Sequence, residues 1–123
     1  MATKSYKELI VWQKAHSFVL DVYSITEGFP KGEMYGLTAQ FRSAAIPVAA
    51  NKAEGYVNKT HADKLRFFNI SQGSIEDCSC YIIFSKDSRY IADNQSIVCD
   101  DLLLETAQPL NSYMSRIKST PAS

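Results

Sequence analysis

Apolar residues recur along this chain at alternating spacings of three and four, which is the pattern of a helix that buries one face. The first such segment runs from about residue 9 to residue 27, and its stripe consists of Val11, Ala15, Phe18, Val22 and Ile25. Gly28 and Pro30 follow the stripe. Glycine suits a left-handed position after a helix and proline cannot continue the hydrogen-bond ladder, so we expect the helix to end there.

The second segment covers about residues 33 to 55. Its stripe consists of Met34, Leu37, Phe41, Ala44 and Val48. Pro47 lies inside the stripe and predicts a kink, because a proline in a helix removes one hydrogen bond and clashes with the preceding turn. The next positions of the stripe are Asn51 and Gly55, so the apolar face becomes polar and small at its end.

The third segment covers about residues 60 to 90, and Thr60 has the character of an N-cap. One apolar face comprises Phe68, Ile75, Cys78 and Ile82, and a second comprises Phe67, Ile70, Ser74, Tyr81 and Phe84. This arc is wider than the core of one bundle requires. We therefore expect Phe67, Ile70, Tyr81 and Phe84 to form an interface between subunits of an oligomer.

The fourth segment covers about residues 94 to 118, and Pro109 should bend it. Its stripe consists of Cys99, Leu103, Thr106, Leu110, Tyr113 and Ile117. The connections between the four segments are short, so neighbours in sequence should be antiparallel. The sequence thus predicts an all-α, up-down-up-down four-helix bundle that forms a single domain over residues 1–123.

Composition excludes several classes of protein. Apolar residues make up 46% of the chain and charged residues 21%, and the formal net charge is zero, so no overall field attracts nucleic acid or an anionic membrane. The first residues form no apolar signal segment, and no apolar run is long enough to span a membrane, so we expect a cytoplasmic protein. The three cysteines, Cys78, Cys80 and Cys99, should then be reduced thiols.

No catalytic constellation stands out. A di-metal bundle needs paired Glu-x-x-His motifs, but Gln13 precedes His16 by three residues and Asn58 precedes His61 by three. The run from Thr60 to Asp63 contains residue types of a nucleophile–base site, yet its spacing is typical of a helix N-terminus. We predict that the protein is not an enzyme and uses no cofactor and no metal.

Polar and small residues interrupt the predicted core near the second and third segments. The group comprises Asn51, Glu54, Ser74 and Glu76. We interpret it as a hydrogen-bond network between helices that fixes their register, with a small ligand or metal site as the alternative. Gly73 should allow a neighbouring helix to approach closely.

Cations gather in the middle of the chain, at Arg42, Lys52, Lys59, Lys64 and Arg66. Residues 91 to 113 contain four acids and no Lys or Arg. The basic segment is consistent with a patch that contacts phosphates. It is also consistent with a basic edge of one subunit that faces the acidic edge of the next, or with ordinary solvated surface, and zero net charge favours these over nucleic acid.

Several short motifs occur in an order that resembles a known family. They are Leu9-Ile10-Val11-Trp12-Gln13-Lys14-Ala15, Val22-Tyr23, Phe29-Pro30, Tyr35-Gly36-Leu37-Thr38-Ala39-Gln40, Arg42-Ser43-Ala44-Ala45, Asn51-Lys52-Ala53-Glu54-Gly55, and the stretch from Arg66-Phe67-Phe68 through Gly73-Ser74-Ile75-Glu76. The chain resembles the four-helix-bundle proteins encoded in intervening sequences of 23S ribosomal RNA genes, which include the accessory protein of diversity-generating retroelements.

The resemblance implies a left-handed antiparallel bundle that assembles as a homopentameric ring. It also implies that a basic surface in the retroelement members engages nucleic acid and a reverse transcriptase. This chain departs from the pattern at Ser43, where the family commonly has a second arginine, at Lys52, where it commonly has isoleucine, and in its neutral charge. These departures weaken a nucleic-acid role.

We therefore expect a non-catalytic, self-assembling helical bundle that acts as a scaffold or accessory protein. The alternative is an accessory protein that binds RNA or DNA, together with a reverse transcriptase, through the basic segment from Lys52 to Arg66.

Overall fold

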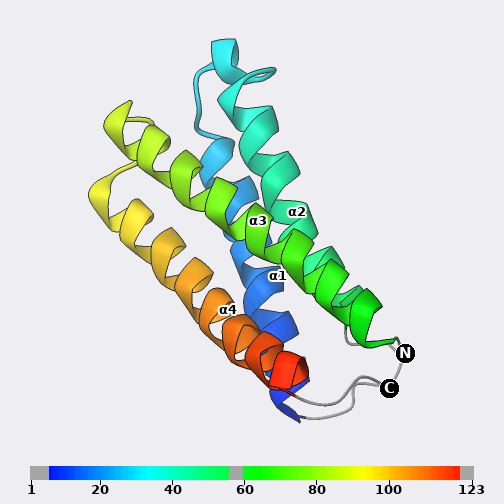
Figure 1. Cartoon of the computed structure of the whole chain (residues 1–123). Helices are drawn as coiled ribbons and strands as arrows, with labels where there is room; N and C mark the ends of the chain where they lie inside the picture. The colour runs from blue at the N-terminus through cyan, green and yellow to red at the C-terminus, as the bar shows by residue number, and fades with distance from the viewer. Residues whose placement is uncertain (1–5, 56–59, 120–123) are drawn as a thin grey trace.

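The computed structural model describes residues 6–55 and 60–119, without the side chains of residues 6–9, 11, 51–55, 109, 110, 113 and 117. These residues form four long helices and no strand (Figure 1). The helices are α1 (Tyr6–Thr26), α2 (Leu37–Gly55), α3 (His61–Asp87) and α4 (Asp93–Ser119), and a short 3-10 helix, η1 (Lys31–Glu33), precedes α2. The all-helical class predicted from the sequence is confirmed.

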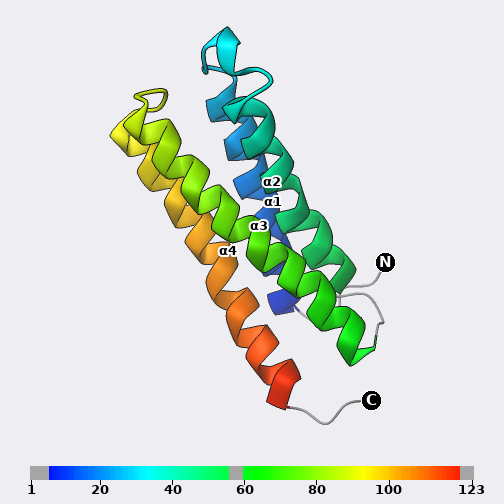
Figure 2. The ribbon, with the colours of Figure 1, turned by 45° about the horizontal axis from the view of Figure 1, so that its top comes forward.

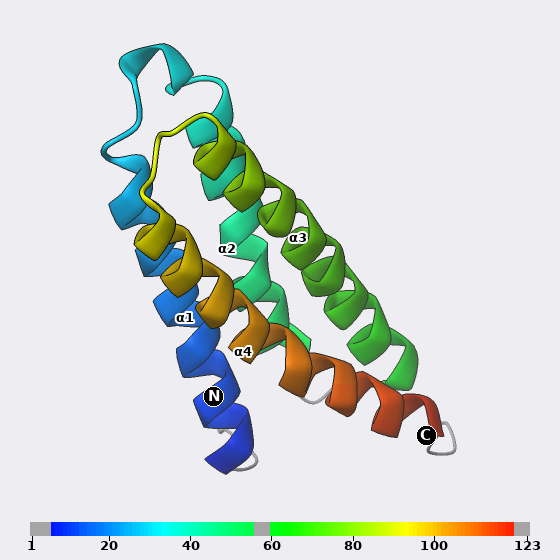
Figure 3. The ribbon, with the colours of Figure 1, turned by 90° about the vertical axis from the view of Figure 1, so that its left-hand side faces the viewer.

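The four helices pack as a bundle in which each helix contacts two others. Helix α2 lies beside α3 along most of its length, and this pair makes the most extensive contact (Figures 1 and 2). Helix α1 contacts α2 and α4, and α3 contacts α4. The α1–α2 and α3–α4 connections lie together at one end of the bundle (Figure 3), while α2 ends and α3 begins near the opposite end.

The core is built from the predicted stripes. Phe18, Phe41 and Phe68 are fully buried and come from α1, α2 and α3, and α4 supplies Cys99 and Thr106. Other predicted stripe residues that are buried are Ala15, Val22, Ile25, Val48, Ile75, Cys78, Ile82 and Leu103. The side chains of Val11, Leu110, Tyr113 and Ile117 lie outside the described residues.

Helix α2 begins later than the sequence pattern predicted. The chain forms η1 first, and the α-helix starts only at Leu37, whose backbone N–H donates to Glu33 Oε1 at 3.3 Å. Glu33 therefore caps the helix from outside instead of starting it. The prediction that Met34 lies on the core stripe is wrong, because this residue precedes the helix and its side chain is exposed.

The end of α1 differs from the prediction, and the start of α3 agrees with it. Gly28 does not adopt the left-handed conformation expected of it. Instead, the chain tightens, and the backbone N–H groups of Gly28 and Phe29 donate to the carbonyls three residues earlier. Thr60 is the predicted N-cap of α3, since its hydroxyl accepts a hydrogen bond from the Asp63 N–H at 3.2 Å.

The α3–α4 connection is held against the α1–α2 connection by Tyr90. Its ring packs on Phe29, with 5.4 Å between the centroids, and its hydroxyl donates to Glu33 Oε2 at 2.8 Å. Arg89, just before it, has a positive φ of 62°, and the Tyr90 N–H reaches back to the Ser85 carbonyl. This left-handed cap turns the chain sharply at the end of α3 and directs Tyr90 onto the neighbouring loop.

A small side chain of α3 lies at its contact with α2. Ser71 is fully buried there, as is Val48 of α2. The Ser71 hydroxyl donates across the interface to the carbonyl oxygens of Pro47 and Val48, at 3.3 Å each. Helix α2 continues through Pro47. In α4, which also continues past its proline, the direction changes slightly in the C-terminal half (Figure 3).

Substitutions of Ser71 test whether close approach or the hydrogen bond matters more. In Ser71→Ala the carbonyls can keep their helical partners, so we expect a loss of about 1 kcal/mol or less in the free energy of unfolding. Ser71→Leu must separate the two helices and should cost more, about 1–3 kcal/mol. Urea denaturation followed by circular dichroism measures both, and equal stability of the two variants would contradict a close-packed interface.

Candidate interaction surfaces

One side of α3 stays open to solvent along the length of the helix. The stripe Ile70, Gly73, Asp77, Cys80 and Phe84 follows helical spacing, and every one of these residues is exposed. We call it the outer face of α3. Phe84 is 55% exposed and Ile70 is 44% exposed, although both side chains are large and apolar.

The other two residues of the predicted interface are partly covered within the chain. Tyr81 is half-buried, and its ring packs on Phe41 with 5.9 Å between the centroids. Phe67 is half-buried beneath the guanidinium of Arg66, which lies 4.8 Å from the ring centroid. The predicted interface therefore divides into an exposed part, Ile70 and Phe84, and a part that already packs against its own chain.

Gly73 does not serve the purpose predicted for it within one chain. A Cβ atom added at Gly73 would meet nothing within 4 Å, and the residue is exposed. The close approach between α2 and α3 occurs at Ser71 instead, on a different side of the helix. The residue that allows this approach was missed because a serine within a helix gives no distinctive signal.

Arg42 is engaged by the end of α1. Its Nε donates to Thr26 Oγ1 at 2.7 Å, a terminal nitrogen donates to the Tyr23 carbonyl at 3.4 Å, and the guanidinium lies 4.7 Å from the centre of the Tyr23 ring. Thr26 is buried and also donates to the Val22 carbonyl. Arg42 thus satisfies carbonyl and hydroxyl groups at a helix C-terminus, where a cation is favourable.

The cations of the basic segment that are described on α3, Lys64 and Arg66, do not join Arg42. From Arg42 to Gly55 the helix extends about 20 Å, at 1.5 Å per residue, before α3 begins. On α3, Lys64 and Arg66 are two residues apart and point about 200° apart. Arg66 also lies 3.9 Å from Asp63. The side chains of Lys52 and Lys59 lie outside the described residues.

The predicted polar cluster is also divided. Ser74 is half-buried on one side of α3, whereas Glu76, two residues later, is exposed on the other side. The side chains of Asn51 and Glu54 are not among those described. The buried hydroxyls that the structure does contain mostly bond within their own helix, as Thr106 does to the Leu102 carbonyl at 2.8 Å.

A carboxylate between α1 and α4 has an unusual environment. Asp21 accepts a hydrogen bond from the buried Cys99 thiol, while its Oδ2 is buried with no hydrogen-bond partner in the described part of the chain. Burial raises the pKa of Asp21, and the Cys99 hydrogen bond lowers it only in part. Burial, together with the charge on Asp21, also raises the pKa of Cys99 well above its usual value.

The described side chains show little that would carry out chemistry. Burial raises the pKa of Cys78 to about 12, so this thiol is not a nucleophile near neutral pH. Over residues 6–55 and 60–119, the described side chains include no cluster of three His, Cys, Asp or Glu that would hold a metal ion. None of the helices, over the same residues, is long and apolar enough to cross a membrane.

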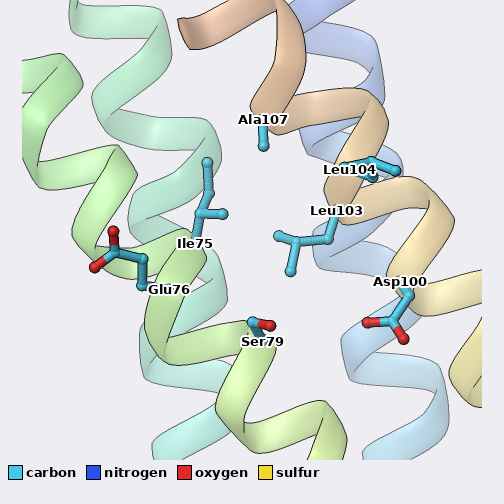
Figure 4. A pocket seen from close by; sticks show the side chains of 7 residues that line it. All are labelled: Ile75, Glu76, Ser79, Asp100, Leu103, Leu104 and Ala107. Carbon is cyan, nitrogen blue, oxygen red and sulfur yellow. The ribbon is translucent and has the colours of Figure 1, made fainter.

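Described side chains line a larger and a smaller groove along seams of the bundle. The larger, about 410 Å³, runs between α3 and α4 and is shown in Figure 4. The smaller, about 280 Å³, lies between α1 and α2 beside Trp12 and His16. The Trp12 and His16 rings stack within 8° of parallel, with 5.1 Å between the centroids. Together they line this seam between α1 and α2.

The model of the 23S rRNA-intervening sequence protein family matches residues 7–112, which include all of α2 and α3 and most of α1 and α4. The chain belongs to this family. A crystal structure of a protein of unknown function from the S23 ribosomal protein family of Bacteroides thetaiotaomicron is also similar, with 16% identity and a TM-score of 0.81. The similarity covers 89% of this chain and 98% of that chain, and it shows a shared fold. A search of curated proteins finds no match.

We expect the substitution Arg42→Ala to destabilise the protein. The variant loses a hydrogen bond to a buried threonine and the contact with the Tyr23 ring, so we expect a decrease of about 1–2 kcal/mol in the free energy of unfolding. Arg42→Lys keeps the charge but should recover less than half of this, because an ammonium cannot reproduce the planar contacts. Arg66→Ala is the control, because Arg66 is exposed and also covers an aromatic ring but bonds no buried group. It should lose less, and an equal loss there would contradict the role assigned to Arg42.

The raised pKa of Asp21 predicts a pH-dependent effect of Asp21→Asn. The folded state holds the proton to a higher pH than the unfolded state, so the stability that it contributes is present below the unfolded pKa and is lost as pH rises through the folded pKa. At neutral pH the ionised carboxylate therefore opposes folding. We expect Asp21→Asn to be more stable than wild type there, with a gain that shrinks toward about pH 4.

Urea denaturation at several pH values measures this difference, with Asp87→Asn on the exposed surface as the control. A variant less stable than wild type at neutral pH would mean that the carboxylate has a favourable partner.

Proposed function

We propose that this protein is a non-catalytic, self-assembling scaffold or accessory protein. Its subunit is a left-handed, up-down-up-down four-helix bundle, and the subunits close into a homopentameric ring through the outer face of α3. The observation that carries this proposal is the exposure of Phe84 and Ile70 on one stripe of a helix whose opposite side is anchored in the core.

The outer face suits contact with another helix. Ile70 and Phe84 are separated by 14 residues, about 21 Å along the axis, so the apolar positions extend over four turns. Gly73 lies between them with open space above it, and a helix crossing there could approach the α3 backbone closely. A helix face of this length supplies part of the roughly 800 Å² per partner that a stable interface buries.

The proposal that the protein is non-catalytic is supported by the structural roles of the residues that could have been nucleophiles. The hydroxyl of Thr60 caps α3 and accepts from the backbone of Asp63. Cys78 and Cys99 are buried core residues with raised pKa values. Thr60, Cys78 and Cys99 therefore have structural uses, whereas Cys80 is exposed on the outer face of α3.

Nucleic-acid binding through the basic segment is the alternative, and it has less support. Arg42 is committed to α1, and Lys64 and Arg66 point in different directions. Any binding by these separated cations should be weak and should fall steeply with salt. Fluorescence anisotropy with short RNA and DNA, at about 50 mM and about 200 mM salt, distinguishes this alternative from the proposed scaffold.

Two substitutions on α3 test self-assembly. Phe84→Asp places a carboxylate where a partner subunit would desolvate it, so we expect smaller particles that keep their helical content. Ile75→Asp places one in the core of the subunit, where Ile75 is only 6% exposed, and should unfold the chain. Light scattering after size exclusion gives the mass, and circular dichroism gives the fold.

Leu20→Asp is the matched control, because Leu20 is as exposed as Phe84 but lies on α1. It should leave the particle size unchanged. A wild-type protein that is monomeric at micromolar concentration would refute the ring itself. A Phe84→Asp variant that keeps the oligomer would refute only the choice of interface.

A further inference from the structure

The groove between α3 and α4 is a second apolar surface, separate from the outer face of α3. Ile75 of α3 and Leu103 of α4 point toward one another across it, with Ala107 beyond them (Figure 4). Ser79 and Asp100 line the same groove from opposite helices. Its volume, about 410 Å³, would accept a few large side chains.

Exposed aliphatic residues continue this surface beyond the groove. Leu104 lies at its edge and is 54% exposed. Ile97 lies seven residues earlier, on the same side of α4, and Ile83 lies four residues after Ser79, on the same side of α3; both are exposed. A small molecule would fill the groove and leave this strip in water, whereas an apolar helix face laid along the seam would cover both.

The charged side chains that line the groove are two carboxylates, Asp100 and Glu76. Burial, followed by the nearby Asp101, raises the pKa of Asp100, and the attraction of Lys86 offsets this only in part. Glu76 lies at the opposite edge, where its carboxylate is directed away from the gap and is exposed (Figure 4). Glu105, also on α4, is paired with Lys14 of α1 at 2.7 Å, so Asp100 and Glu76 are the carboxylates that line the groove. A partner that covers this seam is therefore favoured if it brings cations.

We propose that the α3–α4 groove binds an amphipathic helix of a partner protein. Leucine or isoleucine side chains on one face of that helix enter the groove and cover the strip. A Lys or Arg side chain beside them faces Asp100, and a second reaches over the edge of the groove to Glu76. Helices bind grooves in other proteins by this combination of apolar anchors and flanking charge. Because the groove and the outer face lie on different sides of α3, one subunit can join a ring and hold a partner at the same time.

A synthetic helix of leucine and lysine in heptad order, labelled with fluorescein, tests the proposal on the full chain. Anisotropy at physiological salt should show saturable binding, and a version with glutamate in place of lysine should not bind. Leu104→Asn should weaken binding at least about tenfold. Leu20→Asn, at a leucine of almost equal exposure (56%) on α1, should change binding less than about twofold.

The charge requirement has its own matched pair. Asp100→Asn should weaken binding about three- to fivefold, because the removed carboxylate lines the groove. Asp101→Asn makes the same change one residue away, on a part of α4 that points elsewhere, and should have less than about a twofold effect. Equal losses in the two variants would mean attraction by overall charge alone and would overturn the proposal.

Other occupants give different results. If a second copy of the chain fills the groove, Leu104→Asn will reduce the particle mass and the peptide will compete with assembly, and the proposal is wrong. Loss of the ring leaves this test intact, since Phe84→Asp subunits should still bind the peptide with unchanged affinity. Failure of the groove and failure of the proposed self-assembly are therefore separate outcomes.

Discussion

The close approach of α2 and α3 determines the arrangement of this bundle. The small Ser71 side chain lies at this contact, and its hydroxyl donates to the carbonyls of Pro47 and Val48. A buried hydroxyl with no acceptor would be costly, so the bond fixes the register of the two helices as well as their distance. Helices α1 and α4 then close the remaining sides of a core whose shape this pair sets.

This constraint also fixes the orientation of α3 about its own axis. With Ser71 and Ile75 turned inward, the stripe that contains Ile70 and Phe84 must point away from the core. The side of α3 that bears Glu76 and Ser79 must then lie along the seam with α4. The packing of α3 on α2 therefore sets the position of both surfaces proposed for interaction, and a change in the α2–α3 register would alter both.

Helical periodicity was sufficient to predict the four helices and most of their buried faces, since burial of Phe18, Phe68 and Ile82 follows directly from spacing. It could not predict the partners of individual polar groups. Arg42 looked like part of a basic segment, but its guanidinium binds groups 16 and 19 residues away in sequence, on a different helix. Proximity in sequence does not predict such pairs, because the packing of α2 against α1 brings the partners together.

The roles of individual glycines also could not be predicted from the sequence. Gly28 and Gly73 were given roles that depend on a missing Cβ, yet neither has a positive φ, and a Cβ added at Gly73 would meet nothing within 4 Å. The left-handed position instead belongs to Arg89, where the cap directs Tyr90 onto Phe29 and Glu33. A glycine that costs helix stability, at a position with room for a side chain, is unexplained by the single subunit. This favours a function for the outer face of α3 that appears only when a second molecule is present.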